Sequence, residues 1–281
     1  MNLNQLKILF REKLSSVFEL SEIDAFFYRL VEYKLQLSKI DVVLKPDFEL
    51  KSDDELYFKN ALVDLQQEKP IQYIIGSTDF FGLNFKVTKA TLIPRPETEE
   101  LVDWILKDNS NKNKLTVLDV GTGSGCIPIS LAKHMKQASV VSMDVSEEAL
   151  EVATFNAKTH GVDVAFINDD ILTYANTTAK YDVIVSNPPY VRHLEKQEIK
   201  KNVLAYEPHL ALFVEDNDPL IFYKKITEFA VDNLTDNGVL YFEINQYLGQ
   251  KTVDLVKSYG FSSVELRKDL SGNDRMLKAS K

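Results

Sequence analysis

The fold is decided by the stretch Val117-Leu118-Asp119-Val120-Gly121-Thr122-Gly123-Ser124-Gly125. Its apolar first half is typical of a buried parallel strand, and its glycines allow a tight turn into the helix expected from residue 127. The dinucleotide fingerprint G-x-G-x-x-G is not met, because the third glycine comes one position early. On its own the loop is therefore open to three interpretations: a structural turn, a nicotinamide site or an adenosyl-methionine site.

Strands and helices alternate from this stretch to the C-terminus. The expected strands cover residues 116–120, 140–145, 164–167, 182–186 and 239–244. The expected helices cover residues 127–135, 147–159, 220–234 and 253–259, and a hairpin is expected over 263–278. Such alternation predicts an α/β fold with a Rossmann-like, doubly wound and mostly parallel sheet.

The residues before the sheet divide into two parts. Residues 1–69 have apolar side chains at helical spacing, and Ser52 with Glu55 is a capping box that predicts a helix start. Residues 71–76 and 80–87 are interpreted as short strands with a turn at Gly82. We therefore expect a small helical domain over 1–69, a hairpin linker over 70–90 and the sheet domain over 91–281.

Acidic residues follow two further strands of the expected sheet. Asp144 ends the second strand, where a carboxylate can accept both ribose hydroxyls, and Asp170 with Ile171 lies just past the third strand, where an adenine could be held. Carboxyl ends of parallel strands share one edge, so these residues point to one nucleoside. The combination favours S-adenosylmethionine over the other two interpretations. The predicted cofactor site consists of Gly121, Thr122, Gly123, Ser124, Gly125, Asp144, Asp170, Ile171 and Asn187.

The fourth strand runs into Asn187-Pro188-Pro189-Tyr190. Two prolines stop the strand and stiffen the turn. The side-chain oxygen of Asn187 and the carbonyl of Pro188 can each accept one hydrogen of a planar NH2 group, while the Tyr190 ring offers a wall. We call residues 187–190 the clamp. Beside a sulfonium donor, the clamp predicts methyl transfer to an amide or aryl-amine nitrogen. We predict Asn187, Pro188 and Tyr190 as catalytic residues and all four as substrate-binding residues.

Methyl transfer by this clamp needs alignment more than acid–base chemistry. An amide nitrogen is a poor nucleophile because its lone pair is delocalised, and positioning can lower such a barrier by as much as ~7–11 kcal/mol. The nitrogen can lose its proton after the attack, so no strong base is required. The four histidines are scattered without metal-ligand spacing, and no metal site is predicted.

Composition limits the classes of partner and location. The net charge is −9 and the pI about 5.1, which argues against a nucleic-acid substrate, since a polyanion usually requires a basic stripe. No apolar run approaches the ~20 residues of a membrane span. A single cysteine excludes an internal disulfide framework. We expect a cytoplasmic protein.

Several motifs together carry a family likeness. They are Pro-Ile-Gln-Tyr-Ile-Ile-Gly at 70–76, Phe-Phe-Gly-Leu at 80–83, Leu-Ile-Pro-Arg-Pro-Glu-Thr-Glu at 92–99, the glycine loop, Asn-Pro-Pro-Tyr at 187–190, Glu-Pro-His-Leu-Ala-Leu at 207–212 and Asp-Leu-Ser-Gly-Asn-Asp-Arg at 269–275. With them the chain resembles the HemK/PrmC family, the release-factor glutamine N5-methyltransferases. Asn-Pro-Pro-Tyr occurs in many amino-methyltransferases, and its combination with the Pro-Arg-Pro-Glu-Thr segment is far more specific.

The resemblance implies a substrate and further site residues. The family uses S-adenosylmethionine to methylate the glutamine side chain in the Gly-Gly-Gln loop of bacterial class I release factors. The resemblance implies that residues 187–190 grip this glutamine and that Pro96 and Glu97 lie close to it as substrate-binding residues. Residues 1–69 match the family only in being a helical domain of suitable size, and we expect this domain to dock the substrate. Ile171 stands where some relatives carry a tryptophan.

Three other functions fit part of the pattern. A sister enzyme methylates a glutamine of a large-subunit ribosomal protein, but it typically varies in the Pro-Arg-Pro-Glu-Thr segment, which is intact here. A nucleic-acid methyltransferase acting on an exocyclic amine would share the Asn-Pro-Pro-Tyr chemistry, and the acidic charge argues against it. A cofactor-binding module without turnover is the third, and the intact Asn187 argues against that.

Overall fold

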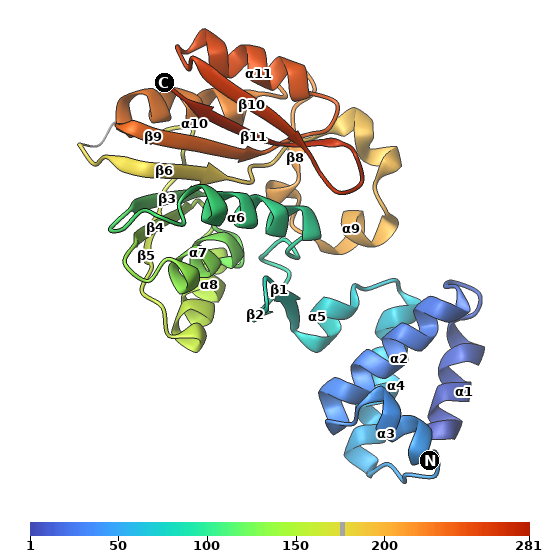
Figure 1. The fold of residues 1–281 in the computed structure, drawn as a ribbon. Helices are drawn as coiled ribbons and strands as arrows, with labels where there is room; N and C mark the ends of the chain where they lie inside the picture. The colour runs from blue at the N-terminus through green and yellow to red at the C-terminus, as the bar shows by residue number, and fades with distance from the viewer. Residues whose placement is uncertain (175–177) are drawn as a thin grey trace. The chain divides into compact units, whose positions relative to one another are not determined.

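The computed structural model describes residues 1–174 and 178–281 and divides them into two compact units. The helical unit comprises Met1–Gly76 with Lys200–Tyr206, and the sheet unit comprises Ser77–Ile199 with Glu207–Lys281. Figure 1 shows the chain coloured from the N-terminus to the C-terminus, so that the blue helices belong to the first unit and the strands to the second.

The helical unit is a bundle around a core of aromatic and aliphatic side chains. Its helices are α1 (Leu3–Leu14), α2 (Leu20–Leu35), α3 (Lys39–Leu44), α4 (Ser52–Gln66), α5 (Ile71–Ile75) and α9 (Lys201–Tyr206). The Phe10 ring packs edge-on against Phe27 at 5.7 Å and Phe58 at 6.4 Å between ring centroids. α9 joins this unit through the Tyr206 hydroxyl, which donates to the Gln67 carbonyl at 2.9 Å.

The capping box predicted at Ser52 and Glu55 is wrong. Lys51 is the N-cap of α4, Ser52 is already helical, and the cap has no side-chain hydrogen bond. Glu55 instead accepts a hydrogen bond from the N-terminal ammonium of Met1 at 2.6 Å. A hydrogen bond between two ionised groups is stronger than one from a neutral backbone N–H. The Glu55 carboxylate therefore binds the ammonium group instead of the N-cap N–H.

The strand predicted over 71–76 is also wrong, because these residues form the short helix α5. The Pro70 carbonyl accepts hydrogen bonds from the N–H groups of Tyr73 and Ile74, and Gly76 ends the helix with φ of 81°. Ile71 and Ile75, four positions apart, are buried in the core of the helical unit. Five nearly uniform apolar residues carry no period that would separate a helix from a strand.

The hairpin with its turn at Gly82 is confirmed, with shorter strands than expected. β1 (Ser77–Phe80) pairs antiparallel with β2 (Leu83–Lys86). Phe81 and Gly82 connect them with φ of 49° and 72°. A two-residue turn with both φ values positive matches the right-handed twist of the strands that it joins, and a glycine adopts this conformation without strain.

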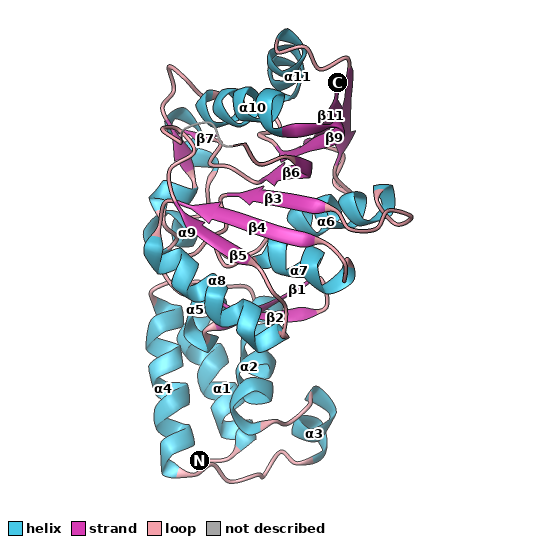
Figure 2. Ribbon diagram, turned by 90° about the vertical axis from the view of Figure 1, so that its left-hand side faces the viewer, coloured by secondary structure: helices cyan, strands magenta, loops and turns pink. Residues whose placement is uncertain are grey.

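The sheet unit contains the predicted α/β fold. Its main sheet has seven strands in the order β10-β11-β9-β6-β3-β4-β5. They are β3 (Thr116–Val120), β4 (Ser139–Asp144), β5 (Ala165–Asn168), β6 (Tyr181–Ser186), β9 (Leu234–Glu243), β10 (Ser263–Lys268) and β11 (Asp274–Ser280). β9, β6, β3, β4 and β5 run parallel, and β11 is antiparallel to both of its neighbours. The fold class and the C-terminal hairpin are therefore confirmed (Figure 2).

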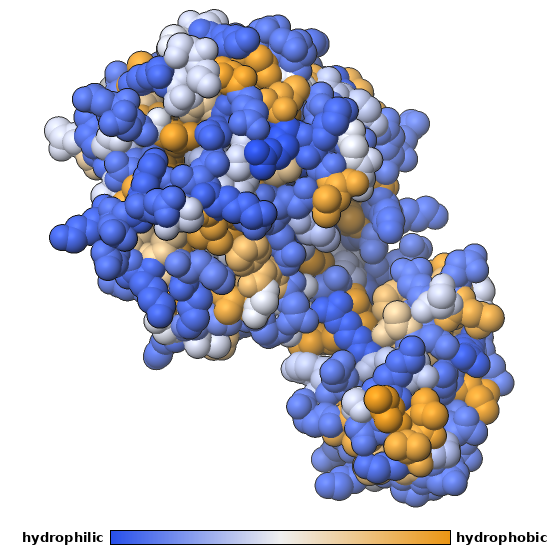
Figure 3. Space-filling view, viewed as in Figure 1, coloured by the Kyte–Doolittle hydropathy of each residue, from blue (hydrophilic) through white to orange (hydrophobic). Residues whose placement is uncertain are grey.

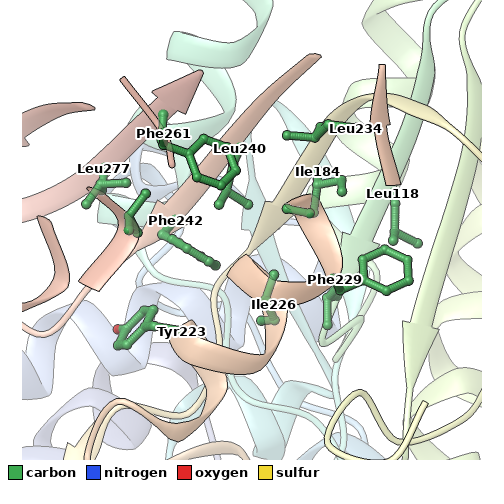
Figure 4. Packing of buried hydrophobic residues seen from close by; sticks show 14 of the residues in the cluster. Leu118, Ile184, Tyr223, Ile226, Phe229, Leu234, Leu240, Phe242, Phe261 and Leu277 are labelled. Carbon is green, nitrogen blue, oxygen red and sulfur yellow. The ribbon is translucent and has the colours of Figure 1, made fainter. Parts of the chain in front are cut away.

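Helices cover both faces of this sheet. They are α6 (Pro96–Asp108), α7 (Cys126–His134), α8 (Glu147–His160), α10 (Ile221–Asn233) and α11 (Gly249–Ser258). Successive strand residues supply opposite faces. Val117 packs in one core cluster with residues of α6 and α7, whereas its neighbour Leu118 packs in the other with α10 and α11. Figure 4 shows the second cluster, in which Ile226 and Phe229 of α10 lie against strand side chains.

An irregular segment follows the Asn-Pro-Pro-Tyr turn. It contains β7 (Val191–Arg192), the 3-10 helix η1 (His193–Glu198), the 3-10 helix η2 (His209–Ala211) and β8 (Phe213–Val214). β7 and β8 form a small parallel pair, which ties the residues after Tyr190 back to those after η2. The sequence pattern predicted none of these short elements.

Two surface properties are relevant to partners. On α3, the side chains of Ile40, Val43 and Leu44 are exposed by 71%, 65% and 73%, and Figure 3 shows apolar residues gathered over this helix. In the part of the chain that the structure describes, no helix is both long and apolar enough to cross a membrane.

Candidate active site

A pocket of about 380 Å³ lies beyond the carboxyl ends of β3, β4 and β6. This is within the range of ligand pockets in proteins, roughly 300–1,000 Å³. The structure brings most of the predicted site residues together in its lining: Gly121, Gly123, Asp144, Asp170, Ile171, Asn187, Pro188 and Pro189. Thr122, Ser124, Gly125, Tyr190, Pro96 and Glu97 lie outside the lining.

The glycines of the loop have different surroundings. A Cβ atom built on Gly123, which lines the pocket, would meet no atom within 4 Å. A Cβ on Gly125 would lie 2.7 Å from Ile129 Cδ1 and 3.1 Å from the Ala153 side chain. Gly123 thus leaves room for a ligand to approach the backbone, whereas Gly125 allows α7 and α8 to pack closely.

Asp144 connects the loop to the end of β4. Its Oδ2 accepts a hydrogen bond from the Gly123 N–H at 2.8 Å, and its Oδ1 accepts one from the Ser146 N–H at 2.9 Å. Burial raises the pKa of Asp144 above its usual value, and the backbone N–H bonds oppose that shift. An ionised carboxylate accepts about four hydrogen bonds, so both oxygens can still bind ligand hydroxyls.

A buried polar chain supports the loop from behind. Ser142 donates to Asp119 Oδ2 at 2.7 Å, and the hydroxyls of Thr122 and Ser142 are 2.6 Å apart. Burial raises the pKa of Asp119 to about 8, and Ser142 opposes the rise. The carboxyl of Asp119 is fully shielded from solvent, so its protonated form fits this environment better than the charged form.

We expect the stability of Asp119→Asn relative to the natural chain to increase with pH. The folded-state pKa of Asp119, about 8, lies above the unfolded value of 3.8. The stability from protonated Asp119 is fully present below the unfolded pKa and is lost as pH rises through the folded pKa. Asparagine does not titrate, so the difference in melting temperature should widen up to pH 8 and then level off. If thermal melts gave the same difference in melting temperature at every pH between the two pKa values, the proposed protonation of Asp119 would be contradicted.

The Asn-Pro-Pro-Tyr turn is held at both ends by the protein. Asn187 Nδ2 donates to Thr98 Oγ1 at 3.2 Å, and the Tyr190 hydroxyl donates to Glu243 Oε1 at 3.1 Å. Asn245 Nδ2 donates to the Tyr190 carbonyl at 2.9 Å. Burial, with the nearby Glu243 carboxylate, raises the pKa of Tyr190, which keeps its hydroxyl a donor. The turn is therefore rigid and faces the pocket with Asn187 and Pro188.

The helix after the Pro-Arg-Pro-Glu-Thr segment brings a different residue to the clamp than expected. Pro96 begins α6 and is exposed, and Glu97 is half-buried in its first turn. Thr98, the next residue, contacts Asn187. Thr98 lies within the Pro-Arg-Pro-Glu-Thr motif, but its role was not predicted, because nothing in a linear pattern shows which side of a helix start faces the strand end.

Sequence reasoning also missed the apolar wall of the pocket. The wall is contributed by Leu92, Pro208, Leu210, Ala211, Phe222 and Ile226. Glu207, buried at 4% exposure, holds two of these segments together: it accepts from the Ile93 N–H at 3.0 Å and from the Arg95 guanidinium at 2.5 Å. One signal for this contact was present in the sequence: residues 92–99 and 207–212 both belong to motifs of the family that the chain resembles.

The chain matches two family models. Residues 9–76 match the PrmC N-terminal domain, and residues 98–210 match the methyltransferase small domain. Among solved structures, a methyltransferase from Pyrococcus furiosus has a TM-score of 0.51 at 20% identity and covers 79% of this chain and 98% of its own. This structural likeness shows the fold.

Close relatives cover nearly the whole chain. A release factor glutamine methyltransferase of Flavobacterium psychrophilum is 56% identical over 274 residues, which is 96% of each chain. Another, of Bacteroides thetaiotaomicron, is 41% identical over 280 residues and covers 99% of this chain and 100% of its own. With this identity, and with the clamp and the glycine loop lining one pocket, the chain belongs to the release factor glutamine methyltransferase family.

Proposed function

We propose that this chain methylates the side-chain amide nitrogen, N5, of the glutamine in the Gly-Gly-Gln loop of bacterial class I release factors. One observation carries the proposal: a Cβ atom on Gly121 would lie 3.7 Å from the Asn187 carbonyl oxygen, so the glycine loop and the clamp border the same space. The relatives named release factor glutamine methyltransferases support the same activity.

The cofactor is S-adenosylmethionine, which supplies an activated methyl group on a sulfonium when bound. The residues present fit it. Gly121 and Gly123 leave space beside the backbone, Asp144 offers acceptors for the ribose hydroxyls, and Ile171 with the other apolar side chains of the pocket can cover the adenine. Asp170 lines the same end of the pocket.

The clamp is proposed to act by orienting the substrate amide. Asn187 Oδ1 and the Pro188 carbonyl would each accept one N–H, which fixes the plane of the amide and aims its nitrogen lone pair. Each such bond contributes only about 0.5–1.5 kcal/mol net, whereas alignment can lower the barrier by up to ~7–11 kcal/mol. Alignment therefore accounts for most of the effect. Tyr190 gives the turn a fixed end, since its hydroxyl is held by Glu243.

The partner, the role of the helical unit and the location belong to the same proposal. We propose that residues 1–69 dock the release factor, with the exposed apolar side chains of α3 as the contact surface. Residues 70–90 then act as a hairpin linker to the methyltransferase domain over 91–281. Release factors act in translation, so the proposed location is the cytoplasm.

The function is tested by incubating the chain with methyl-labelled S-adenosylmethionine and a purified release factor. We expect one label per release factor, mapped by mass spectrometry to the glutamine of the Gly-Gly-Gln loop, and no label when this glutamine is replaced by alanine. Parallel incubations contain large-subunit ribosomal proteins and nucleic acid. Label that appears only in one of those two incubations would identify that molecule as the substrate and overturn the proposal.

A further inference from the structure

Four side chains form a continuous hydrogen-bonded chain behind the clamp. Asn187 Nδ2 donates to Thr98 Oγ1 at 3.2 Å, Thr98 Oγ1 donates to Glu243 Oε2 at 2.6 Å, and the Tyr190 hydroxyl donates to Glu243 Oε1 at 3.1 Å. Thr98 and Glu243 are buried, with 2% and 1% of their surface exposed. Neither lines the cofactor pocket.

The donor and the acceptor of each hydrogen bond in this network follow from the chemistry of its side chains. Tyr190 and Thr98 each give their single hydroxyl proton to a different oxygen of Glu243, which an ionised carboxylate accepts without competition. With its proton committed to Glu243, the Thr98 oxygen has only lone pairs left for Asn187. It can therefore accept from the NH2 group of Asn187 but cannot donate to its carbonyl oxygen.

This order applies to the ionised form of Glu243, which its two hydrogen-bond donors and a nearby cation stabilise. Burial raises the pKa of Glu243, while the hydrogen bonds from Thr98 and Tyr190 and the positive charge of Arg275 oppose the rise. Glu97 is the like charge that adds to the rise. Arg275 is itself held by Asp269 through Nε at 3.1 Å.

We propose that Thr98 and Glu243 are positioning residues that fix the flip of the Asn187 side-chain amide, with its NH2 group toward the protein and its Oδ1 toward the substrate. The inference rests on the proposed function, since it concerns the glutamine amide that the clamp orients. Within the described residues, Asn187 Oδ1 has no protein donor, so it is available to accept from a substrate N–H. The same carboxylate holds Tyr190, which ties the two ends of the clamp to one anchor.

The consequence of losing this order is specific. A flipped Asn187 would present two N–H donors to a substrate group that also carries only N–H donors on its nitrogen. The substrate amide would then lose one of its two acceptors, and its lone pair would no longer be aligned. A misplacement of this kind costs roughly 10²-fold in rate, without a change in the cofactor site.

The test compares Thr98→Val with Thr98→Ser. Valine keeps the shape and removes the hydroxyl, whereas serine keeps the hydroxyl. We expect Thr98→Val to lower kcat about 10²-fold, as for other lost orienting contacts, with the cofactor Kd within about twofold. Thr98→Ser should stay within about threefold in kcat, because the hydrogen-bonded chain remains. A Thr98→Val variant with near-normal kcat overturns the proposal, as does an equal loss in both variants.

A second measurement reads the Asn187 amide without any substrate. In the ¹⁵N-labelled chain, the side-chain NH2 signal of Asn187 is assigned by its disappearance in Asn187→Ala. We expect slow hydrogen exchange of this NH2 group in the natural chain and in Thr98→Ser, and faster exchange in Thr98→Val and in Glu243→Ala. Unchanged exchange in both of the last two overturns the proposal. This readout does not depend on which substrate is methylated, so it separates a failure of the inference from a failure of the proposed function.

Discussion

Replacing Asn187 with alanine is expected to lower kcat by about 10²–10³-fold or more while changing the cofactor Kd by only a few fold. The size follows from the loss of an oriented polar group at the reacting centre, for which losses of about this order are typical. Asn187 lines the pocket together with Pro188 and Pro189, and its side-chain NH2 group donates a hydrogen bond to Thr98. The truncation therefore removes alignment rather than cofactor contacts.

The measurement is single-turnover methyl transfer to the release factor, with cofactor affinity by calorimetry on the same preparation. Asn84→Ala is a matched control: Asn84 is exposed on the β1–β2 hairpin, and its side-chain amide donates a hydrogen bond to Asp79. It should leave both quantities unchanged. An Asn187→Ala variant that retains more than about a tenth of the natural rate would be inconsistent with lone-pair alignment as the main source of catalysis.

The parts of the fold that were predictable are those in which a long pattern repeats. The strand that ends in the glycine loop, the helices α7 and α8 and the C-terminal hairpin were predicted within a few residues, because period and glycines agree there. α5 was mistaken for a strand because its five apolar residues show no period and its helical form depends on burial of Ile71 and Ile75 in the helical unit. β7, β8 and η1 are too short to produce any pattern.

The site residues also fall into a part that the sequence predicts and a part that it does not. Residues that follow strand ends were predicted to converge, and Gly121, Asp144, Ile171 and Asn187 do line one pocket. What sequence could not supply is the set of contacts made across the fold. Thr98 reaches Asn187 from a helix start, and Glu243 reaches Thr98 from the end of β9, far away in the chain. Such contacts depend on strand order and helix rotation, which no local pattern encodes.

Replacing Asp144 with alanine should instead weaken cofactor binding, with a rise in Kd of about 10²- to 10⁴-fold. Two hydroxyls that bond to a carboxylate contribute about 1.5–3 kcal/mol each, and about 1.4 kcal/mol corresponds to a factor of ten. The variant also frees the N–H groups of Gly123 and Ser146, which Asp144 holds at 2.8 Å and 2.9 Å, so the loop loses its tether. Asp144→Asn keeps one acceptor oxygen, so its Kd for the cofactor should lie between that of the natural chain and that of Asp144→Ala.

A second aspartate separates binding from stability in this experiment. Asp182, at the start of β6 and therefore at the opposite end of the sheet, also accepts a backbone N–H, that of Thr116 at 2.8 Å. Asp182→Ala should lower the melting temperature without changing the calorimetric Kd for the cofactor. If Asp182→Ala weakened binding as much as Asp144→Ala, the loss would report general loosening of the sheet. An unchanged Kd in Asp144→Ala would remove Asp144 from the ribose site altogether.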